Sequence, residues 1–162
     1  MVHYPKELDD EHITATGYDM SSNSVVNWLQ GWNFTTDLYR ILEHAVDAVR
    51  GRSSLRTGIV QFLPGVDQRP TETTVMKGVL DTYVSLPPQF HECREITGDA
   101  DKDLFGFQSA NIQATLQLLR TVLLSAEDDV SVSRKCDVAG ELLRVFSIVP
   151  VEYLRAISSP LV

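Results

Sequence analysis

The chain has 162 residues, of which 43% are hydrophobic and 22% are charged, and its formal net charge is −8. This length allows burial of roughly 70% of the surface of the unfolded chain, so we expect one ordinary core and a single domain over residues 1–162. The acidic balance argues against direct nucleic-acid binding, because phosphate contacts require clustered Lys and Arg, and the apolar fraction excludes a disordered tail.

The first part of the chain is expected to be an extended segment followed by a long helix. Residues 1–22 form an acidic lead-in. From Val25 to Gly51 the apolar residues recur at helical spacing, and the polar residues at 22–24 can cap this helix. Gly31 and Asn33 weaken its middle, so the pattern is consistent with one kinked helix or with two abutting helices.

Four further helices follow from the same periodicity. Their expected bounds are Thr71, as the cap, to Pro87, near Leu104 to Leu123, about Val132 to Phe146, and Val151 to Ser158. The inward side chains of the fourth of the five helices are expected to be Val138, Leu142, Leu143 and Phe146. Residues 51–70 are expected to be a helix end and a loop, and residues 89–103 a polar loop. The predicted fold class is therefore all-α, a bundle of about five helices behind an extended acidic lead-in.

An aromatic cluster lies in the first predicted helix. Trp28 and Trp32 are four residues apart, and Phe34 and Tyr39 follow closely. Large aromatic side chains dominate helix packing, so we expect these residues in the core. The alternative is a ligand pocket or a groove for a partner between helices.

One motif is similar to a calcium-binding loop. Asp99, Asp101 and Asp103 match its first three ligand positions, but Leu104 stands where the loop requires glycine and Ala110 where it requires a bidentate glutamate. We therefore interpret the three carboxylates as favourable charges near the positive end of a helix.

A second group of polar residues is a candidate for metal binding or catalysis. Glu43, His44 and Asp47 lie within one helical turn, but a di-metal bundle site needs a Glu-x-x-His pair on each of two helices, and the sequence has none. His44 is therefore expected to be partly buried or at an interface. No spacing typical of a nucleophilic enzyme surrounds His91, and the two cysteines are too far apart for a zinc site. The apolar stretch at 112–124 is too short and too polar to span a bilayer. No catalytic, metal-binding or DNA-binding residue is assigned.

Two segments carry a family resemblance through their order and spacing. The first joins the acidic entry at 5–11 to residues 31–44, and the second is the run at 105–120 that ends in Leu-Leu-Arg. The family-like positions are Asp9, Asp10, Trp32, Leu38, Tyr39, Leu42, Glu43, Asn111, Leu116 and Leu119. Together these segments resemble the fungal-specific transcription factor domain, which is the regulatory region of fungal binuclear zinc-cluster transcription factors.

The resemblance implies a nuclear, non-catalytic regulatory module that acts through protein contacts or effector binding. In the family a separate cluster of six cysteines holds two zinc ions and contacts DNA. This chain has two cysteines, so zinc and DNA binding are implied only for a parent protein. We therefore expect a fragment or a reduced relative whose incomplete bundle exposes an apolar face and so self-associates or recruits partner helices. The alternative hypothesis is a small helical metal protein or enzyme that uses Glu43, His44, Asp47 or His91.

Overall fold

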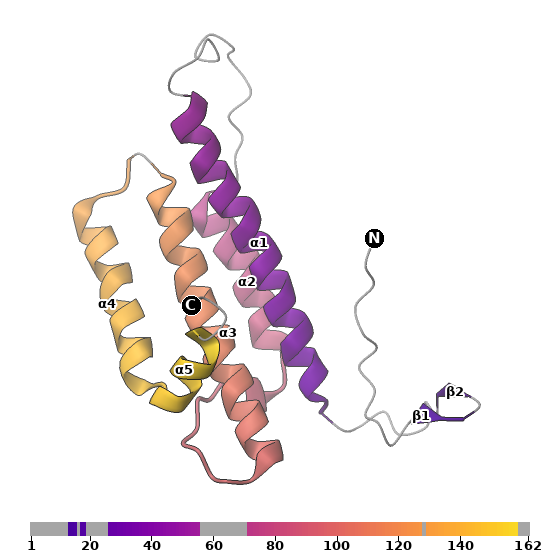
Figure 1. The fold of residues 1–162 in the computed structure, drawn as a ribbon. Coiled ribbons are helices and arrows are strands. Elements are labelled where there is room, and N and C mark those ends of the chain that lie inside the picture. The colour runs from indigo at the N-terminus through magenta and orange to yellow at the C-terminus, as the bar shows by residue number, and fades with distance from the viewer. Residues whose placement is uncertain (1–12, 16, 19–25, 56–70, 128, 159–162) are drawn as a thin grey trace.

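A computed structural model of the chain describes residues 13–15, 17–18, 26–55, 71–127 and 129–158. Apart from one hairpin whose two strands have two residues each, the regular structure in these ranges is helical, which confirms the all-α fold class (Figure 1). The elements are β1 (Ile13–Thr14), β2 (Gly17–Tyr18), α1 (Trp28–Leu55), α2 (Glu72–Ser85), the 3-10 turn η3 (Pro88–Phe90), α3 (Ala100–Ser125), α4 (Val132–Ile148) and α5 (Val151–Ser158).

The hairpin of β1 and β2 lies in the segment that was predicted to be an extended acidic lead-in, and it was not predicted. Its two strands pair antiparallel with Ile13 opposite Tyr18. Gly17 has a φ of 143°, a backbone conformation that glycine adopts readily and other residues rarely adopt.

Side-chain caps explain where three of the helices begin. Thr71, Asp99 and Ser131 each accept a hydrogen bond from the backbone N–H three residues further along, at 3.3, 3.3 and 3.2 Å. Such bonds satisfy N–H groups that have no partner within the helix. The cap at Thr71 was predicted. Asp99 places the start of α3 at Ala100, earlier than the predicted start near Leu104.

The first helix is a single continuous element. Of the two alternatives that the sequence left open, the structure has one helix over Trp28–Leu55. Near its start, the Asn27 Oδ1 atom accepts a hydrogen bond from the Leu29 backbone N–H at 2.7 Å. The predicted caps at 22–24 lie outside the described residues, as do the predicted loop at 56–70 and the ends of the chain.

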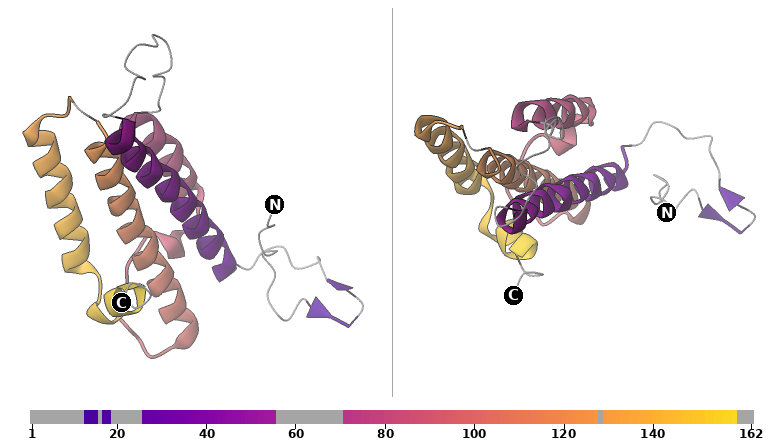
Figure 2. Two further views of the ribbon diagram at one scale, coloured as in Figure 1. Left: turned by 45° about the horizontal axis from the view of Figure 1, so that its top comes forward. Right: turned by 90° about the horizontal axis from the view of Figure 1, so that it is seen from above.

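The helix α3 is the centre of the bundle. It packs against α1, α2, η3, α4 and α5, and Figure 2 shows it between α4 on one side and α1 with α2 on the other. Because neighbours surround it, α3 buries side chains on several faces, with Ala110, Ile112 and Leu119 fully enclosed. None of the described helices is both long and apolar enough to cross a membrane.

The larger hydrophobic cluster joins α1, α2, η3 and α3. Its buried members are Phe34, Leu38, Ala45, Met76, Val79, Phe90, Ile112, Leu116 and Leu119. Phe90 is fully buried, so the expectation of a polar loop from residue 89 was wrong at this end. A Cβ atom on Gly31 would lie 2.4 Å from Cε1 of the Phe90 ring. Glycine at this position therefore lets the ring pack directly on the backbone of α1.

Asp99 and Asp103, two of the three acidic residues that are similar to a calcium loop, make contacts at the start of α3. Asp103 accepts hydrogen bonds from the Thr97 N–H and hydroxyl, at 2.7 and 2.8 Å, and from the Gly98 N–H at 2.9 Å. These bonds, above all the one from the Thr97 backbone, lower the pKa of the Asp103 carboxyl. A bond from the Lys102 ammonium, 2.8 Å away, lowers the pKa of Asp99. The structure therefore gives Asp99 and Asp103 capping and anchoring contacts.

The inward face of α4 differs from the prediction. Val138 and Val145 are buried and Leu142 is half-buried, but Leu143 is 70% exposed and Phe146 is 39% exposed. The main packing partner of α4 is α3, so only a narrow stripe of the helix is covered. A second, smaller cluster contains Val145, Val149 and Tyr153 with Ala110 of α3.

The aromatic residues of α1 also divide between the core and the surface. Phe34 is buried, as expected, but Trp28, Trp32 and Tyr39 are 37%, 49% and 46% exposed, so placing them in the core was wrong. Successive helical residues are about 100° apart. The three exposed aromatic residues therefore share a face beside the one that carries Phe34 and Leu38.

Candidate functional site

A groove lies over α3 between α2 and α4, and we call it the α2–α4 groove. Its volume is about 680 Å³. The lining residues are Glu72, Thr73, Met76, Lys77, Leu80, Asp81 and Tyr83 of α2, His91 after η3, Gln113, Leu116, Gln117 and Arg120 of α3, and Arg134, Arg144 and Val145 of α4.

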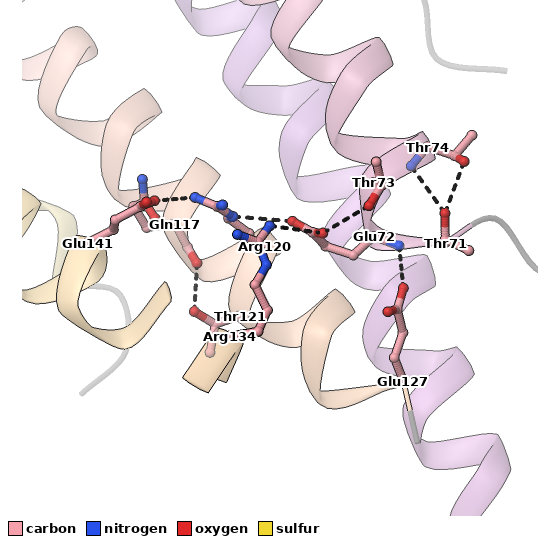
Figure 3. A network of polar contacts seen from close by, with 10 residues as sticks. All are labelled: Thr71, Glu72, Thr73, Thr74, Gln117, Arg120, Thr121, Glu127, Arg134 and Glu141. Atoms are coloured by element: carbon pink, nitrogen blue, oxygen red, sulfur yellow. Dashed lines mark hydrogen bonds and ion pairs between the residues drawn. The ribbon is translucent and has the colours of Figure 1, made fainter. Parts of the chain in front are cut away.

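A network of ion pairs connects the three helices at one end of the groove (Figure 3). The Glu72 side chain is only 6% exposed and lies between two arginines. Its Oε1 atom is 3.2 Å from Nε of Arg120, and its Oε2 atom is 3.6 Å from Nη2 of Arg134. Arg120 also pairs with Glu141 of α4. A buried carboxylate requires such partners, because an unpaired charge in the interior is strongly unfavourable.

The start of α2 is held from a second direction. The backbone N–H of Glu72 donates to the Glu127 side chain at 2.6 Å, and the Thr71 hydroxyl caps the same turn. A carboxylate near a helix N-terminus is favourable, because free N–H groups and the helix dipole give that end positive character. The wall formed by α2 is therefore fixed to the segment that follows α3.

At the other end of the groove, His91 is fixed by hydrogen bonds. Its Nε2 atom is 2.8 Å from the Tyr83 carbonyl oxygen, which can only accept, so Nε2 carries the proton. Gln113 Nε2 donates to the His91 carbonyl oxygen at 3.0 Å and to the Ser109 hydroxyl at 3.1 Å. Burial raises the pKa of the Tyr83 hydroxyl. These side chains stabilise the fold and shape the end of the groove.

The environment of the Cys93 thiol, two residues after His91, does not activate it as a nucleophile. Cys93 is a free, partly buried cysteine, and this burial raises the pKa of its thiol. A raised pKa lowers the fraction of thiolate, which is the reactive form. Because the His91 ring is directed to the Tyr83 carbonyl oxygen, the structure supplies no activated pair at this position.

The residues considered for metal binding lie on the surface of α1. Glu43, His44 and Asp47 are exposed. Of the two alternatives for His44, partial burial was wrong, and a place at an interface stays a prediction. His44 borders a smaller cleft between α1 and α2. Across residues 26–55, 71–127 and 129–158, no group of three or more His, Cys, Asp or Glu side chains is placed to hold a metal ion.

The family-like positions of the sequence fall into four groups. Leu38, Leu116 and Leu119 are in the larger hydrophobic cluster, and Leu42 packs against it. Asn111 is buried, and its Oδ1 atom accepts from the Tyr39 hydroxyl at 3.3 Å, whereas Trp32 and Glu43 are exposed. Asp9 and Asp10 lie outside the described residues.

Sequence reasoning did not identify most of the groove. Of the family-like positions only Leu116 lines it, and Glu72, Lys77 and Arg144 were not singled out, whereas Arg120 was noted only as a polar break and as the end of the Leu-Leu-Arg run. One available signal was Arg120, the only charged residue in the stretch at 112–124. A charge at such a position requires a partner when the helix is buried.

Comparison of the chain with protein-family models, with curated proteins and with solved structures finds no match.

Proposed function

We propose that this chain is a non-catalytic, transcription-regulatory helical module that acts by binding another protein in the α2–α4 groove. The observation that carries the proposal is the groove itself, which has an apolar floor and charged walls provided by three helices. The resemblance to the regulatory region of fungal zinc-cluster factors supplies the regulatory context, a nuclear location and a zinc cluster only in a parent protein.

The chemistry of the groove favours contact over catalysis. Glu72 is held by two arginines, and the His91 ring donates to a backbone carbonyl oxygen. These titratable groups are therefore committed to structural contacts. A groove between helices is a recurrent binding surface for an amphipathic helix, whose apolar side chains enter at helical spacing.

The proposal is tested by a transcription reporter. The chain is fused to an unrelated DNA-binding domain, and expression is compared for the wild type, Leu80→Glu and Val84→Glu. Leu80 lines the groove and is 43% exposed, whereas Val84 lies outside it on the same helix and is 74% exposed. Both variants place a new carboxylate on an exposed site, so both are expected to fold.

We expect the wild-type fusion and Val84→Glu to change reporter expression equally, and Leu80→Glu to lose the effect. An unchanged reporter with the wild-type fusion contradicts the proposal. Stoichiometric metal in the purified protein that disappears in His44→Ala also contradicts it and supports the metal-protein alternative.

A further inference from the structure

We propose that the α2–α4 groove binds an acidic amphipathic helix of about three turns from a partner protein. This inference rests on the proposed protein-binding function and adds the chemistry of the partner. The length of the groove, its apolar floor and the charges on its two walls support this choice of partner.

The length of the groove matches a short helix. Its lining covers residues 72–83 of α2 and 134–145 of α4, and at about 1.5 Å per residue each wall is about 16 Å long. This is the length of about three helical turns. Glu72 pairs with Arg134, so the N-terminal ends of the two walls lie together. An elongated groove of this kind suits a peptide helix better than a compact small molecule.

The two described helices that form the walls are not packed on each other. Both α2 and α4 pack on α3, and the two do not form a packed pair with each other in the described part of the chain. Figure 2 shows them on different sides of α3. The open space between them is the α2–α4 groove, and the ion pairs of Glu72 cross it at one end.

The floor of the groove is apolar. Met76 and Leu80 are one turn apart on α2, Leu116 is on α3 and Val145 is on α4. Met76, Leu116 and Val145 are buried, and Leu80 remains 43% exposed. A helix that covers Leu80 removes apolar surface from water, which is the main favourable contribution to association.

The walls select a partner of negative charge. Four cationic side chains line the groove, Lys77, Arg120, Arg134 and Arg144, against the two carboxylates of Glu72 and Asp81 and the adjacent carboxylate of Glu141, which pairs with Arg120. This local excess of positive charge contrasts with the formal net charge of −8 of the chain. Complementary charge across an interface provides specificity and accelerates encounter.

Two of these cations are available to a partner. Lys77 on α2 and Arg144 on α4 make no ion pair with another described residue, whereas Arg120 and Arg134 hold Glu72. Lys77 lies about 8 Å along its wall from Glu72, and Arg144 about 15 Å along the opposite wall from Arg134. A bound helix can therefore pair carboxylates on both of its flanks, one near the middle of the groove and one near its end.

The test uses the full chain and synthetic peptides. A fluorescent amphipathic peptide of about eleven residues, which is about three turns, is built from Leu, Ala and Glu at helical spacing. It is titrated with the protein and followed by anisotropy. A second peptide has Lys at every Glu position, and a third is a scrambled form of the acidic peptide. We expect the acidic peptide to bind, the other two to bind far more weakly, and binding to weaken as salt is added.

Variants locate the binding. The double variant Lys77→Glu and Arg144→Glu is expected to weaken binding of the acidic peptide about tenfold, and Leu80→Glu is expected to weaken it further. The matched control is Arg50→Glu with Lys135→Glu, which changes the net charge equally at exposed positions outside the groove. This control is expected to bind like the wild type.

Three results overturn the inference: equal binding of the acidic and basic peptides, equal weakening by the two double variants, or sedimentation in which a second copy of the chain fills the groove and Leu80→Glu removes the association. A reporter that responds while the acidic peptide is not preferred contradicts the partner chemistry alone. An unresponsive reporter with intact, groove-dependent peptide binding contradicts the transcription role alone.

Discussion

The ion-pair network at the end of the groove leads to a quantitative prediction for Glu72→Ala. At an effective dielectric constant of about 20, charges 3.2 Å apart attract each other by about 5 kcal/mol, and removal from water offsets much of this gain. In the variant Arg120 stays 19% exposed and retains only Glu141, so the cost of its burial is not recovered. We expect Glu72→Ala to lower the free energy of unfolding by about 2–3 kcal/mol, somewhat less than the loss of a fully buried pair.

The comparison variant is Glu141→Ala, because Glu141 pairs with the same arginine but its side chain is 42% exposed. Solvent screens such a pair, so we expect a loss of about 0.5–1 kcal/mol. Urea unfolding followed by circular dichroism measures both values. A double-mutant cycle with Arg120→Ala isolates the Glu72–Arg120 pair, for which we expect a coupling of about 1–2 kcal/mol. If Glu72→Ala destabilises the protein no more than Glu141→Ala, the argument that burial makes the Glu72 ion pairs stronger than the exposed Glu141 pair is wrong.

Three further predictions concern the packing and the loop before α3. Gly140→Ala, where the new Cβ meets open space, is expected to stabilise the protein by about 0.5–1 kcal/mol. Gly31→Ala, where the Phe90 ring blocks the new Cβ, is expected to destabilise it by about 1–2 kcal/mol in the same urea assay. Equal effects of the two variants contradict the direct packing of the Phe90 ring on the backbone of α1. Gln108 is fully buried and neither amide atom has a partner among the described residues, so Gln108→Met is expected to raise the free energy of unfolding by about 1–2 kcal/mol, and a loss of stability refutes this. Because the pKa of Asp103 is lowered on folding, its contribution is complete above its ordinary pKa of 3.8 and is lost as the pH falls through the lowered value. Asp103→Asn is therefore expected to be less stable than wild type at neutral pH, and this difference is expected to shrink as the pH falls through the lowered pKa of Asp103. A difference that does not depend on pH contradicts the role of the charge.

The sequence predicted the helices well because their signals are local. Thr71 as a cap and the apolar spacing of each helix depend on residues that are neighbours along the chain, so they can be recognised without the fold. The start of α3 was placed late because Asp99 was interpreted as one of three favourable charges and not as the cap itself.

Burial was predicted less well, because it depends on which helices become neighbours. The periodicity placed Leu143 and Phe146 on an apolar face, but α4 has α3 as its main neighbour and leaves much of that face exposed. Phe90 lies in a short polar segment without periodicity, and its complete burial results from its contacts with Gly31 of α1 and with Phe105 of α3.

The groove was missed for the same reason. Its network joins Glu72 to Arg120, residues that are 48 positions apart, and no local pattern connects two charges over that distance. The charge of Arg120 within the stretch at 112–124 was used only to exclude a membrane span. Lys77 and Arg144, further along the two walls, are ordinary surface charges in the sequence. Only the packing of α2 and α4 on α3 places them in the same groove.

The central position of α3 also affects how the chain acquires its structure during synthesis. The helices α1 and α2 leave the ribosome before α3, whose residues Ile112, Leu116 and Leu119 complete the cluster around Phe34 and Leu38. The Tyr39–Asn111 hydrogen bond, which spans 72 positions, also cannot form before this part of α3 has emerged. We therefore expect the apolar faces of α1 and α2 to be exposed on the nascent chain until α3 emerges, a stage at which aggregation competes with folding.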